Sequence, residues 1–226
     1  MKIIAFDVRS TIAHFRRPDT TSTHLTFPFI PPTAAKGLVG AVLGIEDFVT
    51  TDQVGIQLLS EVRMISQRLS LLGKGGGNTF NRPTTIQLLV EPAYRVYYAG
   101  EQYTDRLEFM LQNKQAIYST YLGSAFSLTT PEYAGTWDVS EVDFSGDWYS
   151  AISVVPASII EELSLEDGFY YQRASGFMKK YEGGRSFTKS VDFIYEQRGA
   201  KLTFKLKGTD VEFTSVELDG ELVCLL

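Results

Sequence analysis

The residues best suited to chemistry in this 226-residue chain are cations next to aromatic rings, and a first group of them lies within residues 14–44. Paired arginines beside an aromatic ring suit a phosphate clamp with a stacking platform. Lys36 falls in the first turn of a predicted helix, where a cation opposes the helix dipole unless an anion docks there. The alternative is that Lys36 extends into water. The candidate contacts in this group are His14, Phe15, Arg16, Arg17, Lys36 and Gly37.

A second group lies in a glycine-rich stretch between two predicted strands, from Leu72 to Pro83. It is not a P-loop, because the Gly-x4-Gly-Lys-Ser/Thr spacing is absent and no helix follows. A loop of this length is usually functional or mobile, although an idle flexible tip is the alternative. Three consecutive glycines predict that it stays mobile until a ligand orders it. Its candidate RNA contacts are Lys74, Gly75, Gly76, Gly77, Asn78, Phe80 and Arg82, joined by Arg63 and Arg68 from the preceding segment.

The net charge of −6 argues against nucleic acid when taken alone, but the charges are unevenly distributed. Residues 1–100 hold 10 Lys and Arg against 7 Asp and Glu, residues 101–170 hold 2 against 12, and residues 171–226 hold 9 against 8. The acidic middle is either a solvated face or a surface for a basic partner. The pattern permits an RNA surface built from the N-terminal part and from residues 171–207.

The same composition excludes several classes of protein. The single cysteine, Cys224, leaves no disulfide framework and no cysteine metal site, and we expect neither a metal nor a cofactor. The apolar stretch 37–45 is too short to span a bilayer. A strand-like run follows Met1 directly, without a charged and then apolar leader, so we expect a cytoplasmic protein with no membrane contact.

The elements that must position these residues follow from hydrophobic periodicity. The predicted strands are 2–9, 62–71 and 86–98, and the predicted helices are 33–42 and 107–118. Thr33 is the expected N-cap of the first helix, and Gly44 is its left-handed C-cap. Gly37, Gly40 and Gly44 cost helix stability, which predicts close packing of this helix on a neighbouring backbone.

The end of the chain and the strand 86–98 carry further signals. Residues 201–226 predict a β-meander with a tight turn at Asp219-Gly220. On the strand 86–98 one face is apolar, and the other, with Gln87, Glu91 and Arg95, is expected to meet RNA or a partner protein. The strand–helix–strand–strand–helix–strand order predicts an α+β, ferredoxin-like fold, which is also the order of the RNA-recognition motif.

The chain resembles the fifth-numbered subunit family of CRISPR Cascade complexes, within the RAMP superfamily, and its details are similar to the type I-B branch. The resemblance covers residues 6–126 and rests chiefly on Phe15-Arg16-Arg17-Pro18 and on the block that runs from Thr26-Phe27-Pro28 to Gly44. Weaker matches lie at 91–97 and 121–126, and the last hundred residues match only loosely.

This resemblance implies a ferredoxin-like RAMP core at residues 1–135, with a thumb hairpin inserted at about 72–83, and a smaller β-rich part at 136–226 packed on it. It implies a non-catalytic subunit of an antiviral ribonucleoprotein complex. Such a subunit binds the 5′ handle of the CRISPR RNA, caps the filament of backbone subunits and docks the large subunit, so that it meets target DNA only indirectly. The thumb pushes between nucleotides where handle meets spacer.

Two alternatives remain. One branch of the same family is a metal-independent endoribonuclease that processes precursor CRISPR RNA with tyrosine, lysine and histidine. His14 beside Arg16 permits such a site on paper, but the catalytic branch carries its lysine–histidine pair after the second helix, where this chain has no histidine between Asn113 and Tyr118. The other alternative is a protein-interaction domain with no RNA role.

Overall fold

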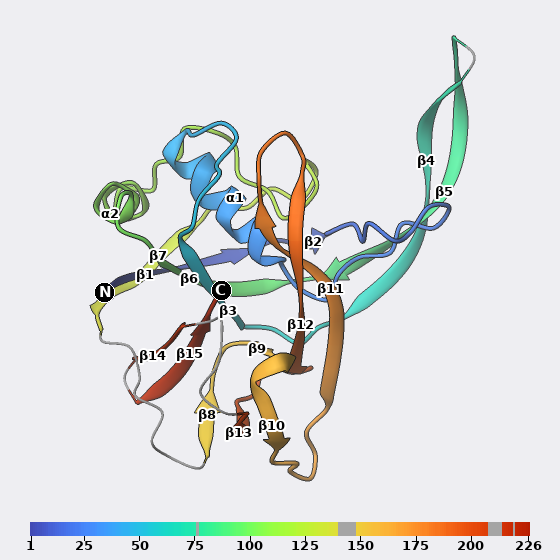
Figure 1. Ribbon diagram of the computed structural model, residues 1–226. Helices are drawn as coiled ribbons and strands as arrows, with labels where there is room; N and C mark the ends of the chain where they lie inside the picture. The colour runs from blue at the N-terminus through green and yellow to red at the C-terminus, as the bar shows by residue number, and fades with distance from the viewer. Residues whose placement is uncertain (76, 140–147, 208–213, 219) are drawn as a thin grey trace.

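A four-stranded antiparallel sheet forms the centre of the molecule, in the order β3-β6-β1-β7 (Figure 1). The computed structural model describes residues 1–75, 77–139, 148–207, 214–218 and 220–226, with backbone alone at 74, 75 and 78. The central strands are β1 (Lys2–Arg9), β3 (Gln53–Leu58), β6 (Ala93–Ala99) and β7 (Glu132–Asp138). The register of β1 with β6 runs without a break from Ile3↔Ala99 to Arg9↔Ala93.

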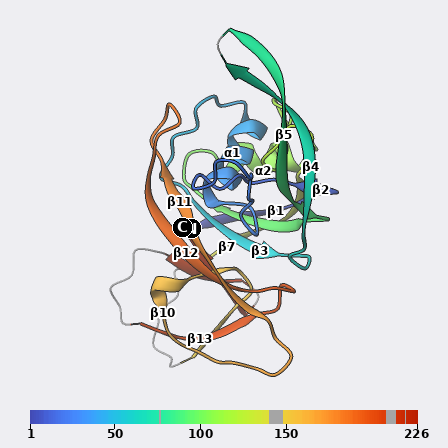
Figure 2. The same ribbon diagram turned by 90° about the vertical axis from the view of Figure 1, so that its right-hand side faces the viewer.

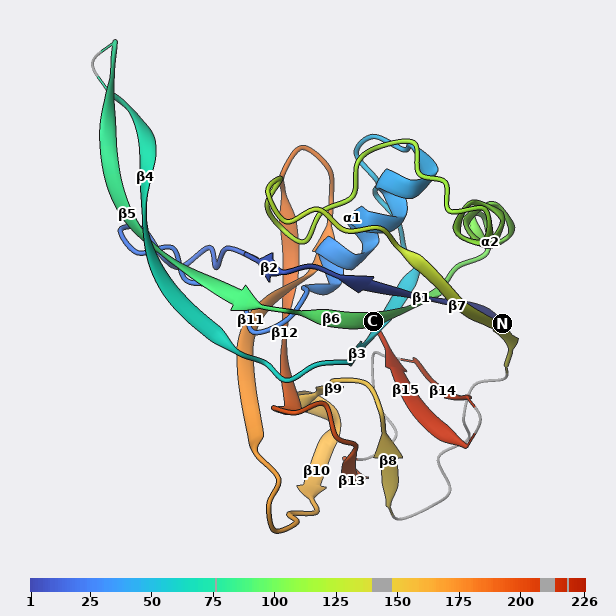
Figure 3. The ribbon, with the colours of Figure 1, turned by 180° about the vertical axis from the view of Figure 1, so that it is seen from behind.

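The helices α1 (Pro32–Leu43) and α2 (Thr104–Gln112) cover one face of this sheet (Figure 3). Their apolar sides pack with Ile4, Phe6 and Val8 of β1 in the largest core. The helix α1 begins at prolines, whose fixed φ suits a first turn, and it ends at Gly44, whose φ of +72° closes the helix in the left-handed conformation.

The opposite face of the sheet is covered by the hairpin of β14 (Thr214–Leu218) and β15 (Glu221–Leu225). Ile3 and Ala5 of β1 pack there against Val216 and Val223. A strand covered on both faces has no polar side to present, which explains why β1 is buried continuously from Ile3 to Val8.

The remaining C-terminal strands build two further sheets, in the orders β10-β13-β8-β15-β14 and β11-β12-β9. Their bounds are β8 (Tyr149–Ala151), β9 (Val155–Pro156), β10 (Ile160–Leu163), β11 (Tyr171–Tyr181), β12 (Phe187–Glu196) and β13 (Leu202–Leu206), with a 3-10 turn at Ala157–Ile159. The β11–β12 hairpin packs on the N-terminal half of the chain, because the ring of Phe177 stacks on Phe27 and Phe29 at centroid distances of 4.4 and 4.7 Å.

A separate three-stranded sheet, β2-β5-β4, leaves the body of the molecule as a long hairpin (Figures 1 and 2). Its strands are β2 (Ile12–Ala13), β4 (Met64–Gly75) and β5 (Asn78–Val90). Among the described residues, no helix is long and apolar enough to cross a membrane.

The fold is α+β, as the sequence predicts, but the predicted strands need correction. The predicted strand 86–98 is two strands in different sheets. The chain breaks between them at Glu91, with a φ of +48°, and at Pro92, which has no N–H for a ladder. The predicted strand 62–71 belongs to the projecting hairpin, whereas the core strand β3 at Gln53–Leu58 was not predicted.

Other boundaries also differ from the predictions. The helix N-cap is Pro31 rather than Thr33, and α2 ends at Gln112, so that Ile117 and Tyr118 are exposed instead of helical. The meander is wrong, because β13 pairs with β8 and β10 while β14 pairs with β15. The tight turn was predicted at Asp219-Gly220. Gly220 has a φ of +82°, and Asp219 lies outside the described residues. The division at residue 135 stays a prediction, and β7 spans that position.

Two glycines of α1 give opposite predictions for alanine substitution. A Cβ at Gly37 meets no atom within 4 Å, so Gly37→Ala should raise the free energy of unfolding by about 0.5–1 kcal/mol through lost chain entropy. A Cβ at Gly40 would lie 2.8 Å from the Cβ of Phe48, so Gly40→Ala should lower the free energy of unfolding despite the same entropic gain. Urea denaturation of both variants measures the difference, and an equal stabilisation of both would contradict the packing at Gly40.

Candidate nucleic-acid interface

The projecting hairpin is the most prominent feature of the surface. Its strands β4 and β5 pair without interruption from Met64↔Leu89 to Gly75↔Asn78. Among the described residues, other parts of the chain hold the hairpin at its base: β2 pairs with β5 there, and the N–H of His24 donates to the carbonyl of Thr85 at 2.9 Å. The predicted loop from Leu72 to Pro83 is therefore wrong as to conformation, since its described residues form a regular ladder that continues to Gly75↔Asn78.

Phe80 lies near the tip of this hairpin and covers Gly73, its direct partner in the ladder. A Cβ on Gly73 would lie 2.7 Å from the ring, and Gly73 is buried by it although it is far from the core. The ring itself stays 51% exposed. An aromatic ring held by a facing glycine loses little freedom on binding and presents a surface on which a base can stack.

The register separates the hairpin's arginines onto two faces. Paired residues of antiparallel strands share a face, and the faces alternate along each strand. Leu71↔Arg82 and Gly73↔Phe80 therefore put Arg82 beside Phe80, whereas Arg68↔Thr85 puts Arg68 on the opposite face. Both arginines are exposed, and within the described part of the chain neither guanidinium has a hydrogen-bonded acceptor.

At the base of the hairpin the rings of His14 and His24 stack, with centroids 6.4 Å apart. The Nδ1 of His14 lies 2.8 Å from the carbonyl oxygen of Gln87, so the proton must sit on Nδ1 and Nε2 is a bare acceptor. Among the described atoms, this buried Nε2 has no partner. Burial lowers the pKa of both imidazoles, and nearby Arg16 lowers them further, so both rings are neutral at neutral pH.

Three predicted contacts are not available in the way the sequence suggested. Phe15 is a core residue, 4% exposed, and cannot serve as a stacking platform. The Arg17 guanidinium donates to both carboxylate oxygens of Asp19, at 3.1 and 2.7 Å. Arg63 donates to the carboxylate of Glu91 at 2.6 Å. The predicted arginine pair is thus reduced to Arg16, which is exposed and bonded only to the carbonyl of Thr20 among the described residues.

The predicted polar face of 86–98 is also divided. Gln87 accepts the N–H of Thr26 at the base of the hairpin. Arg95 lies in the central sheet, where its guanidinium donates to Asp7 at 2.7 and 3.1 Å. These groups stabilise the fold rather than form one shared contact surface. Of the remaining candidates, Gly77 forms part of the turn with a φ of +81°, while Gly76 and the side chains of Lys74 and Asn78 lie outside the described residues, and Gly75 is known only by its ladder pairing.

Lys36 and Gly37 lie away from the hairpin, in a pocket beside α1 that the tip of the β11–β12 hairpin closes. Sequence reasoning missed the other half of this pocket, which consists of Tyr181, Arg185 and Phe187. A signal was present, since Gly183-Gly184-Arg185 flanked by aromatic residues is a glycine-rich tip with a cation, of the same kind as the stretch 72–83.

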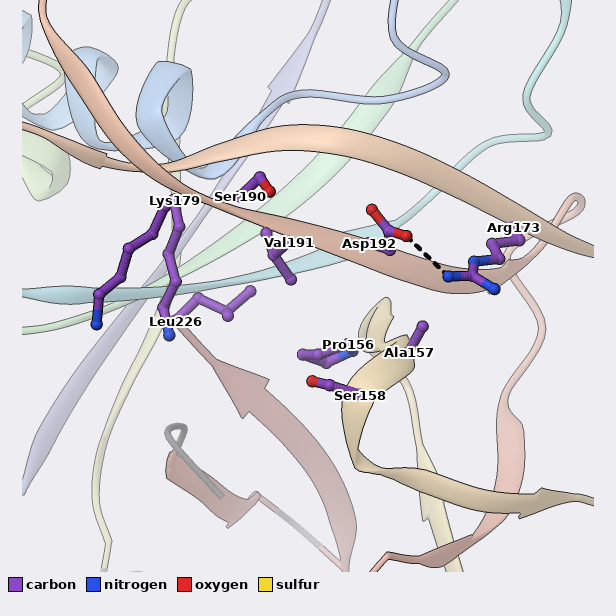
Figure 4. Close-up of a pocket in the computed structure, with 10 residues that line it drawn as sticks. Pro156, Ala157, Ser158, Arg173, Lys179, Ser190, Val191, Asp192 and Leu226 are labelled. Carbon is purple, nitrogen blue, oxygen red and sulfur yellow. Dashed lines mark hydrogen bonds and ion pairs between the residues drawn. The ribbon is translucent and has the colours of Figure 1, made fainter. Parts of the chain in front are cut away.

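A larger hollow, of about 650 Å³, lies between β11–β12, the 3-10 turn and Leu226 (Figure 4). Arg173 and Asp192 both line it, and they form an ion pair at 2.8 Å. Its lining carries both signs of charge, with Arg173, Lys179 and Lys189 beside Asp192.

Solved structures share this architecture. A CRISPR protein from Archaeoglobus fulgidus matches with a TM-score of 0.57 at 13% identity, over 99% of this chain and 99% of its own. A chain of a CRISPR RNA-guided surveillance complex matches with a TM-score of 0.53 at 10% identity, over 86% of this chain and 90% of its own. The chain shares their fold. No protein-family model and no curated protein matches the sequence.

The outer hairpin should be removable without cost to the fold. The pair Leu71↔Arg82 lies four residues along the ladder from the native last pair, Gly75↔Asn78, so both pairs have the same place in the alternating hydrogen-bond pattern. Replacing residues 72–81 by Asn-Gly therefore keeps the register of the ladder. Because the deleted residues project from the body, thermal unfolding should shift by less than about 2 °C. Leu89→Ala, at the buried base, is the sensitivity control and should cost about 2–5 kcal/mol. A large loss of stability from the trimmed chain would mean that the tip packs on the core.

Proposed function

We propose that this chain is a non-catalytic RNA-binding subunit of a CRISPR effector complex, of the Cascade handle-binding family within the RAMP superfamily and of its type I-B branch. In this proposal it grips the 5′ handle of the CRISPR RNA in the cytoplasm, caps the filament of backbone subunits and docks the large subunit for RNA-guided DNA targeting. The projecting hairpin is the thumb that enters the RNA where handle meets spacer.

One observation carries the proposal: Phe80 and Arg82 share an exposed face of the hairpin, in its outer part beyond the buried base at Leu89. A ring braced on Gly73 next to an unpaired guanidinium suits a base and its phosphate. The stretch lies where the resemblance implies a thumb. The hairpin extends from Met64 to Val90, which is longer than the expected 72–83.

The fold supports the same proposal at a coarser level. We infer that the central sheet is a ferredoxin-like RAMP core, since its βαββαβ order with neighbours β3-β6-β1-β7 is that of a split βαβ unit. The two structural neighbours are described as a CRISPR protein and as part of an RNA-guided surveillance complex, which favours an effector-complex role over an interaction domain without RNA.

The histidines favour the non-catalytic reading over the endoribonuclease. General acid catalysis of RNA cleavage needs a group that holds a proton near neutral pH. The pKa of His14 and that of His24 are both lowered, chiefly by burial, which disfavours the imidazolium form that would protonate a leaving oxygen. The Nδ1 of His14 is in addition engaged by the carbonyl of Gln87.

The proposed function is tested by guide-RNA retention in a coexpressed complex. Phe80→Leu with Arg82→Gln keeps an apolar cover on Gly73 while it removes the aromatic ring and the charge. Retention of the 5′ handle, measured by native mass spectrometry, should fall about tenfold, which corresponds to the lower part of the 1–3 kcal/mol range for base stacking. Arg68→Gln makes the same charge change on the opposite face and should have a smaller effect.

Unchanged retention in the Phe80→Leu, Arg82→Gln variant would contradict the thumb assignment. An equal loss from Arg68→Gln would indicate general electrostatic attraction rather than a specific face. Circular dichroism of each variant provides the control for folding.

A further inference from the structure

The pocket at Lys36 is a second site, separate from the hairpin. It has a volume of about 370 Å³ and is enclosed by the N-terminal half of α1, the loop after α1 and the tip of the β11–β12 hairpin. In Figure 1 this tip stands directly beside α1. The lining residues are Thr33, Ala34, Lys36, Gly37, Phe48, Thr50, Tyr181, Arg185 and Phe187. The volume falls near the lower end of the roughly 300–1,000 Å³ typical of small-molecule sites.

The charged groups that line the pocket are two cations, Lys36 and Arg185, and no lining residue is acidic. Within the described part of the chain, neither the Lys36 ammonium nor the Arg185 guanidinium has a hydrogen-bonded or ion-paired acceptor. The pKa of Lys36 is lowered to about 8, chiefly by burial, with Asp52 opposing the shift and Lys179 adding to it. A partly buried cation without an acceptor is unfavourable, and an anionic group in the pocket would relieve that cost.

The tip that carries Arg185 is held in a strained conformation over the pocket. Gly183, Gly184 and Arg185 have φ values of +88°, +56° and +64°. This conformation is unfavourable for arginine, because its Cβ crowds the following carbonyl. Asp47 fixes the tip to the loop after α1, since it accepts the Tyr181 hydroxyl and, at 3.4 Å, the N–H of Gly184. The fold therefore maintains a strained turn whose effect is to keep a cation at the pocket.

The walls of the pocket are aromatic. The rings of Tyr181 and Phe187 lie 5.2 Å apart, Phe48 lines the other side, and Phe187 is 45% exposed. Inorganic phosphate would use the cations and leave the rings without a partner. A divalent cation has no carboxylate to bind in the lining. A planar base joined to a phosphate uses the rings, the cations and the hydroxyls of Thr33 and Thr50 together.

We propose that this pocket binds one nucleotide, with the base against the aromatic walls and the phosphate between Lys36 and Arg185. The site is distinct from the hairpin and does not require the proposed function, because a nucleotide offers the same base and phosphate whether it ends an RNA chain or is free.

The test uses the purified full-length chain and adenosine 5′-monophosphate as the probe, by isothermal titration calorimetry. Adenosine and inorganic phosphate should each bind at least tenfold more weakly than the nucleotide, because each lacks one half of the recognition. Lys36→Gln and Arg185→Gln should each weaken nucleotide binding at least tenfold. Lys205→Gln, on β13 and outside the pocket, makes the same charge change and should alter it less than twofold.

Gly37→Leu gives a test that changes no charge. Gly37 lines the pocket and has open space beside it, so the leucine side chain should fill the pocket and abolish binding while thermal unfolding shows an intact fold. Competition identifies the source of the nucleotide. Displacement by a 5′-phosphorylated tetranucleotide but not by its dephosphorylated form supports an RNA end, and displacement by neither supports a free nucleotide.

Absence of saturable nucleotide binding below a Kd of about 10 mM would overturn the proposal. Binding that survives Lys36→Gln, Arg185→Gln and Gly37→Leu would overturn it as well. Neither outcome tests the proposed thumb, which is tested separately by retention of the 5′ handle.

Discussion

The structure depends on the burial of both faces of the central sheet. Along β1, Ile4, Phe6 and Val8 pack on the helices, while Ile3 and Ala5 pack on β14–β15. In an RNA-recognition motif one face of the sheet is left open and aromatic residues on it stack the bases. Here β14–β15 covers that face, so the strand order of an RNA-binding domain is present without its usual binding platform. In the proposed function, contacts with RNA therefore use elements that leave the sheet, and two hairpins do so.

The pairing of charges differs between the body of the molecule and the two projecting hairpins. Three arginines close to the body are paired with carboxylates: Arg95 with Asp7, Arg63 with Glu91 and Arg17 with Asp19. Arg82 on the first hairpin and Arg185 on the second have no such partner among the described residues. A net charge of −6 is thus compatible with local cationic surfaces, because Arg82 and Arg185 both lie on projecting hairpins.

Local signals were predictable from the sequence, and long-range ones were not. The end of α1 follows from Gly44, and the position of the outer part of the projecting hairpin follows from the glycine run at Gly75–Gly77. The sequence of β3 shows an alternation of apolar residues, because its buried side chains are Val54, Ile56 and Leu58. The strand β7 is only half-buried, and its sequence shows no such alternation.

The site was harder to predict than the fold. Burial of Phe15 and the pairing of Arg63 with Glu91 arise from chain segments that meet only in the folded protein. The pocket at Lys36 depends on a tip about 150 residues further along the chain, whose glycines are visible in the sequence but whose position beside α1 is not.

The central claim is that the two hairpins, and not the sheet, meet nucleic acid. Ultraviolet cross-linking of the assembled RNA-bearing complex, followed by mass spectrometry of the cross-linked peptides, tests it most directly. The account predicts cross-links at the peptide that contains Phe80 and at the peptide that contains Phe187, both exposed aromatic residues. Cross-links confined to other exposed aromatic residues, such as Phe109, Tyr121 and Phe126, would contradict it.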